Sequence, residues 1–245
     1  MADIQHLEHA PIKEALIDVR VEATTSFEDI GAANPELAEQ YPTVENIQRS
    51  EIGWKINAEE QTSSVEQQNV KVGYKYTSED GRYIAQFRLD GFTFSRLEPY
   101  ETWELMRDEA KRLWEIYKRV ARPETITRIA VRYINAIKIP LPFNDFNEYL
   151  NSPPEVPEGL PQSIAGFLIR LALKEPSINA DCIFTQALQG GNQDEVTVVL
   201  DVDAFILSNF DASELYFWEN IEQLRSFKND VFFKSITDKT IGLFQ

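Results

Sequence analysis

The sequence predicts an α+β protein of two similar β-α-β-β-β-α halves, with a mostly antiparallel sheet or sheets covered by long helices. One observation is an internal sequence similarity: Ile17-Asp18-Val19-Arg20 resembles Ile129-Ala130-Val131-Arg132, and Leu89-Asp90 recurs as Leu200-Asp201. A second is that each half closes with a long amphipathic segment. We therefore expect residues 1–122 and 123–245 to be two α+β halves of one compact, pseudo-symmetric body.

Strand and helix periodicities define the first half. Lys13–Glu22 alternates, with Ile17 and Val19 on one side and Asp18 and Arg20 on the other, which predicts a strand. A helix over residues 27–40, divided by a proline, should follow. We then expect a polar loop over Glu59–Asn69, and three or four strands, around Ile47–Ile56, Val70–Thr77, Arg82–Leu89 and Phe92–Leu97.

The boundary between the halves follows the clearest helical pattern, Thr102–Val120, in which apolar residues recur every three or four positions. Beyond it, the sequence predicts a long strand over Ile126–Ile139, a short helix over Phe143–Leu150 and a proline-rich loop. Later strands are expected over Ile164–Leu173, Ile178–Leu188 and Glu195–Leu207. A closing helix is expected over Ser213–Phe233, with a capping box of Asp211 and Glu214 and an apolar stripe of Phe217, Ile221, Leu224 and Val231.

Composition indicates a folded, acidic, cytoplasmic protein. Of 245 residues 43% are hydrophobic, and the net charge is −16, which argues against nucleic acid or an anionic membrane as partner. A single cysteine suits a reducing compartment, and no signal peptide or spanning segment is evident. Arg107–Lys138 is locally basic, which we interpret as alternation of charge along a helix and a strand, with a patch for an anionic ligand as the alternative.

Two short blocks carry a family resemblance. His9-Ala10-Pro11-Ile12-Lys13-Glu14-Ala15, and Val131-Arg132-Tyr133-Ile134-Asn135 followed by Pro140-Leu141-Pro142, resemble a family of sporadically distributed bacterial proteins of about this length. That family has no assigned activity. The resemblance implies association with mobile-element, defence or toxin–antitoxin loci.

The sequence lacks the residue patterns that common catalytic sites use. The only histidines are His6 and His9, and Pro11 argues against the helix that would place both on one metal. Cys182 has alternating apolar neighbours and is interpreted as strand core. No phosphate-binding glycine loop is present. We therefore predict no catalytic residues, no metal and no cofactor.

Charged residues on the first strand of each half are the candidate ligand-binding residues: Asp18, Arg20, Arg128 and Arg132. If these strands meet, Arg132 would oppose Asp18. Cross-strand ion pairs on a half-exposed sheet are the plainer interpretation. The alternative is a charged β-tunnel for a phosphorylated ligand, although the Glu-x-Glu-x-Lys strand of triphosphate-tunnel enzymes is absent. Asp201 and Asp203 share a strand face, where solvated carboxylates are favoured over Mg²⁺ ligands.

The functional prediction is a non-catalytic protein-interaction or regulatory component, with a protein partner or self-association. Two alternatives stay open: a metal-dependent phosphohydrolase with a charged β-tunnel, and a small-molecule sensor with a central groove. The sensor alternative rests on aromatic residues of the expected central strands, which are otherwise core: Trp54, Tyr74, Tyr76, Tyr83 and Phe87.

Overall fold

A single arched sheet dominates the computed structural model, which describes residues 7–57, 62–212 and 217–245. Within these residues nine strands pair in the order β2-β3-β4-β5-β1-β6-β9-β8-β7, and every pairing is antiparallel. The strands are β1 (Ile12–Val21), β2 (Thr43–Asn57), β3 (Thr62–Thr77), β4 (Tyr83–Arg88), β5 (Gly91–Leu97), β6 (Thr125–Pro140), β7 (Leu168–Glu175), β8 (Ala180–Gly191) and β9 (Glu195–Asp211).

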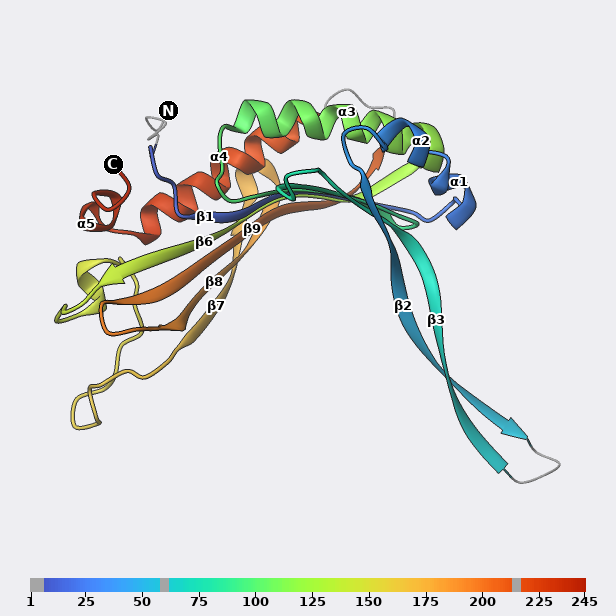
Figure 1. Cartoon of the computed structure of the whole chain (residues 1–245). Coiled ribbons are helices and arrows are strands. Elements are labelled where there is room, and N and C mark those ends of the chain that lie inside the picture. The colour runs from blue at the N-terminus through green and yellow to red at the C-terminus, as the bar shows by residue number, and fades with distance from the viewer. Residues whose placement is uncertain (1–6, 58–61, 213–216) are drawn as a thin grey trace.

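Helices are the minor component. They are α1 (Phe27–Gly31), α2 (Asn34–Leu37), α3 (Trp103–Ala121), α4 (Phe217–Ser235) and α5 (Asp238–Ile241), with 3₁₀ turns η1 (Phe146–Glu148) and η2 (Pro176–Ile178). Figure 1 shows α3 and α4 on the convex side of the arch, over its centre, while the concave face is open.

The predicted fold class is therefore wrong. The structure is 44% strand and 26% helix. The strands form one antiparallel sheet, and long helices do not cover the whole of this sheet. The physical reason is length: α3 has 19 residues and spans about 28 Å. The 15-residue β2 spans about 50 Å and runs well beyond that helix layer. The first half also contributes five strands, and a 3₁₀ turn stands where the second half was expected to have a short helix.

The two halves meet at β1 and β6, which pair from Ile12 to Val21 with two register shifts. On each side of this central pair the strands follow in reverse sequence order, as β5-β4-β3-β2 beside β1 and as β9-β8-β7 beside β6. The sheet is therefore continuous across the predicted boundary between the halves.

Most predicted elements exist with shifted ends. The strand expected over Lys13–Glu22 is β1, and the helix expected over Thr102–Val120 is α3. The polar loop expected over Glu59–Asn69 is wrong from Thr62 onward, because β3 starts there and pairs with β2. His6, and Glu214 of the expected capping box, lie outside the described residues.

The core lies between the convex face of the sheet and the helices. Ile17 and Val19 of β1 are fully buried there, and so are Leu113 of α3 and Leu224 of α4. The alternate residues of β1, such as Asp18, face the open side. One face of the sheet is thus apolar and covered, and the other carries the charges.

Candidate functional site

Three of the four predicted ligand-binding residues, Asp18, Arg20 and Arg128, meet on the open face, where they form a network of ion pairs. The Asp18 carboxylate accepts from Arg128 at 3.0 Å, from Arg20 at 3.2 Å and from the Thr93 hydroxyl at 2.6 Å. Arg88, which the sequence did not single out, donates to the same carboxylate at 3.2 Å. Burial alone would raise the pKa of Asp18, but Arg20, Thr93 and the other arginines outweigh it and lower that pKa.

The expected opposition of Arg132 and Asp18 does not occur. The register places Ala130 opposite Asp18, and Leu16 opposite Arg132. Arg132 instead binds Asp201 through two hydrogen bonds of 2.8 and 2.6 Å. Arg128 links Asp18 to Asp203, because the amino group of Arg128 that does not bind Asp18 donates to the Asp203 carboxylate at 2.8 Å.

The carboxylates of this face are thus already bound to arginines. Among the described residues, no group of three or more His, Cys, Asp or Glu side chains could hold a metal ion. The sheet is also open, since β2 and β7 each pair on one side only within the described ranges. The arrangement therefore matches cross-strand ion pairing better than a closed, charged tunnel.

The aromatic and cysteine candidates belong to the core. Tyr76 and Phe87 are fully buried, and their rings meet edge to face with centroids 5.1 Å apart. Tyr74 stacks on Phe27 at 4.4 Å. Cys182 is buried, and burial raises the pKa of its thiol to about 12, which leaves it unreactive. The side chain of Trp54 lies outside the described residues.

The locally basic segment is spread over two elements and is largely paired. On α3, Arg112 binds Glu109 at 2.7 Å and Lys118 binds Glu115 at 2.7 Å. On β6, Lys138 binds Glu195 at 2.9 Å. These pairs favour alternation of charge over a patch for an anionic ligand.

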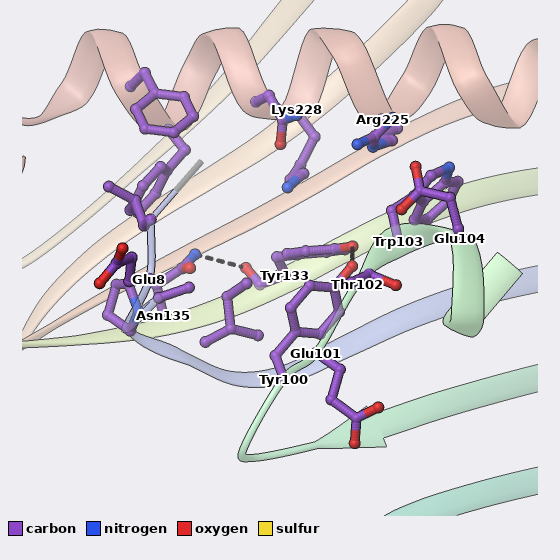
Figure 2. A pocket seen from close by; sticks show the side chains of 17 residues that line it. Glu8, Tyr100, Glu101, Thr102, Trp103, Glu104, Tyr133, Asn135, Arg225 and Lys228 are labelled. Carbon is purple, nitrogen blue, oxygen red and sulfur yellow. Dashed lines mark hydrogen bonds between the residues drawn. The ribbon is translucent and has the colours of Figure 1, made fainter. Parts of the chain in front are cut away.

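A different site lies on the covered side, where a cavity of about 370 Å³ opens between the chain leading into β1, the start of α3, the middle of β6 and the second half of α4. Figure 2 shows the side chains that line it. The lining residues are Leu7, Glu8, Ala10, Pro11, Ile12, Tyr100, Glu101, Thr102, Trp103, Glu104, Tyr133, Asn135, Arg225, Lys228, Asn229, Phe232 and Phe233.

Lys228 is the unusual member of this set. Its residue is 5% exposed, and its amino nitrogen lies 3.4 Å from the centre of the Tyr133 ring. Within the described ranges, no carboxylate forms an ion pair with it. Burial, with a smaller effect from Arg225, lowers the pKa of Lys228 well below its ordinary value of 10.5. The amine is therefore disposed to be neutral.

Arg225 supplies the cavity's permanent positive charge, one turn before Lys228 on α4. Its guanidinium lies over the Trp103 ring, 5.2 Å from the ring centre, and 3.7 Å from the carboxylate of Glu222. The same carboxylate accepts from the Trp103 indole N–H at 2.9 Å. The contacts with Trp103 and Glu222 hold the arginine beside the cavity.

Polar groups of β6 and of the turn before α3 complete the lining. The Tyr100 and Tyr133 hydroxyls are hydrogen-bonded at 2.7 Å, and burial raises the pKa of Tyr100 to about 12. Asn135 is 2% exposed, and its amide nitrogen donates to the Leu200 carbonyl at 3.1 Å. Both tyrosines therefore keep their protons at neutral pH and can donate hydrogen bonds.

Sequence reasoning missed this site although a signal was present. The buried stripe of α4 runs through Phe217, Ile221, Leu224, Lys228 and Phe232. The sequence interpretation ended the stripe at Val231, which is only half-buried. Continuing the three-and-four spacing from Leu224 reaches Lys228, a charged residue where an apolar one is expected.

Comparison of the chain with family models and with curated proteins finds no match. Among the described helices, none has the length and apolarity needed to cross a membrane.

Proposed function

We propose that the protein is a non-catalytic, cytoplasmic regulatory component that binds a small anionic molecule in the cavity beneath α4. The observation that carries this proposal is Lys228, a buried amine at the cavity wall with no acidic partner among the described residues. Burial without an acidic partner disfavours the charged form of the amine, so the protonated lysine needs a partner of opposite charge. A ligand anion would provide it.

The volume of the cavity and the composition of its walls suit a ligand that has from a few non-hydrogen atoms to the size of a small metabolite. A volume of about 370 Å³ lies at the small end of ligand-binding pockets. The walls combine apolar side chains with a few polar groups, as such pockets do. The two sequence blocks that carry the family resemblance also meet here, since Ala10, Pro11 and Ile12 line one wall and Tyr133 and Asn135 another.

Thermal unfolding and calorimetry with acetate, pyruvate and inorganic phosphate test this proposal. Ligand at a hundred times its Kd stabilises a folded protein by about 2.7 kcal/mol, which is a readily measured rise in Tm. Arg225→Gln and Lys228→Met should lose that rise for the anion that binds. Lys234→Met, on the exposed side of the same helix, should keep it because that side chain is 78% exposed. If no small anion shifts Tm or releases heat, the proposal is wrong.

A protein-binding role is a second proposal, favoured by the edge strand β7. Among the residues that the structure describes, this strand pairs with β8 alone, and it exposes Leu168 at 72% and Leu171 at 44%. Unpaired edges with exposed apolar residues are where further strands add. A second copy of this chain is the partner we propose. Light scattering over a range of concentrations should show dimers that Leu168→Lys abolishes, and a concentration-independent monomer would contradict this role.

A further inference from the structure

The position of the Lys228 amine points to chemistry beyond simple charge recognition. The nitrogen lies at the wall of the cavity and on the face of the Tyr133 ring. Figure 2 shows the side chain descending from α4 toward that ring. An exposed lysine keeps its ammonium group in water, whereas here the residue is 5% exposed. A lysine held away from water beside a second cation is the environment that makes an amine nucleophilic.

Three glutamates line the cavity, and among the described residues none of them forms an ion pair with the Lys228 amine. Glu101 lines the cavity but binds Arg96 at 2.8 Å. Glu8 and Glu104 also line it, and neither forms an ion pair with Lys228 in the part of the chain that the structure describes. The charged neighbour that acts on Lys228 is Arg225, which disfavours a second positive charge.

Arg225 and Lys228 together define the ligand that the site can take. Side chains three positions apart on a helix have Cβ atoms about 5–6 Å apart. A guanidinium prefers a carboxylate, and a neutral amine reacts with a carbonyl carbon. The two groups therefore suit a short molecule in which the carboxylate is bonded to the carbonyl carbon of a ketone or aldehyde, or is separated from it by one carbon.

The tyrosine pair supplies a proton donor. In a hydrogen bond between two hydroxyls one O–H is used, so the other O–H of Tyr100 or Tyr133 stays available. Loss of water from the adduct of an amine and a carbonyl needs a proton on the departing oxygen. A protonated phenol beside the amine can assist that step.

We propose that Lys228 forms an imine with the carbonyl carbon of a small oxo acid whose carboxylate is bound by Arg225. The nitrogen lone pair forms a C–N bond, the neutral amine gives up its two protons, the carbonyl oxygen takes up two protons and leaves as one molecule of water, and a C=N bond replaces the C=O bond. The reaction needs no oxidant or reductant, and water reverses it. The inference rests on the proposed function, because it uses the same cavity and the same anion-binding arginine.

Reduction with sodium borohydride tests the inference, since it converts an imine into a stable secondary amine. The full chain should be incubated with pyruvate, acetoacetate or propionaldehyde, reduced, and analysed by intact mass and by peptide mapping. We expect one adduct per chain on Lys228 with the oxo acids, none at that peptide in Lys228→Met, and unchanged labelling in Lys234→Met. Arg225→Gln should lower labelling by pyruvate at least tenfold and labelling by propionaldehyde much less.

The outcomes separate the inference from the proposed function. An anion that binds in calorimetry while no oxo acid labels Lys228 overturns the imine and leaves the binding site standing. Equal labelling of Lys228 and surface lysines also overturns it, because the site then gives no selectivity. If calorimetry shows no heat of binding and no adduct forms on Lys228, both the inference and the proposed function are overturned. Peptide mapping of the wild-type chain decides the matter even if Lys228→Met fails to fold.

Discussion

Replacing Lys228 with methionine should stabilise the protein near neutral pH. Methionine fills similar space without a group that must be desolvated. The pKa of Lys228 in the folded chain lies well below 10.5, its ordinary value. In the unfolded chain the lysine therefore keeps its proton up to about pH 10.5, whereas in the folded chain it loses that proton at a lower pH. That proton loss costs free energy wherever the unfolded chain would hold the proton.

The magnitude follows from proton linkage. Between the folded and unfolded pKa values the two states of the wild type differ by one proton, so its free energy of unfolding rises by about 1.4 kcal/mol per pH unit. Lys228→Met lacks this contribution. The advantage of the variant should therefore shrink with that slope as the pH is raised toward 10.5, and vanish above it.

Neighbouring groups do not imitate this effect. The pKa of Tyr100 is raised to about 12 and that of Tyr133 lies well above 10, so neither titrates over the same range. Arg225 stays charged throughout. Glu8, Glu101 and Glu104 line the same cavity in both proteins, so their effects largely cancel in the difference.

Urea unfolding followed by tryptophan fluorescence, at several pH values from 7 to 10, measures the difference directly. Lys234→Met controls for loss of a positive charge on the same helix and should show no such slope, because that side chain is 78% exposed. A Lys228→Met protein that is less stable than wild type by a constant amount would refute the reasoning. The lysine would then be a charged structural partner of the Tyr133 ring.

Other substitutions test the open face and the turns. Asp18→Asn should cost about 1–3 kcal/mol at pH 7. Because the folded pKa of Asp18 is lowered, this loss should disappear as the pH falls below about 3.8 in urea titrations. Arg132→Ala should cost at most about 1 kcal/mol by the same assay, since its side chain is 42% exposed. Gly91→Ala should lower Tm strongly, because a Cβ there would lie 2.3 Å from the Val19 carbonyl, whereas Gly81→Ala meets no atom within 4 Å and should cost about 1 kcal/mol.

Sequence periodicity predicted strands where one face is buried, and it missed the first part of β3, where pairing alone defines the strand. In β1, Ile17 and Val19 alternate with Asp18 and Arg20, and the sheet buries one set. The start of β3 has no such alternation, yet Asn57 pairs with Thr62 across the hairpin. Backbone hydrogen bonds are the same for every residue type, so they leave no trace in the sequence.

The open-face residues could be grouped from sequence, but their partners could not. Alternation placed Asp18 and Arg128 on the charged face of their strands, and the structure joins them. The sequence interpretation instead opposed Asp18 to Arg132. The register of the β1–β6 pairing places Asp18 opposite Ala130, two residues from Arg132, and alternation along each strand does not specify which residues of two strands lie opposite.

The covered site shows where the two halves differ. If α3 and α4 are superposed by their buried stripes, Met106, Ala110, Leu113 and Ala121 correspond to Phe217, Ile221, Leu224 and Phe232. The position equivalent to Lys228 is then Tyr117, whose hydroxyl donates to the Arg88 carbonyl at 2.9 Å.

This correspondence locates a position at which the two helices differ. Tyr117 is a buried polar residue whose hydrogen bond is made within its own half. Lys228 occupies the same place in the stripe, yet in the described part of the chain no carboxylate pairs with it, and a cavity lies beside it. A core position gains nothing from a charged residue unless something outside the core uses it. The half that ends in α4 therefore supplies the amine and the arginine of the cavity, while the chain before β1 and the start of α3 supply most of the remaining lining, so we expect binding to depend on both halves.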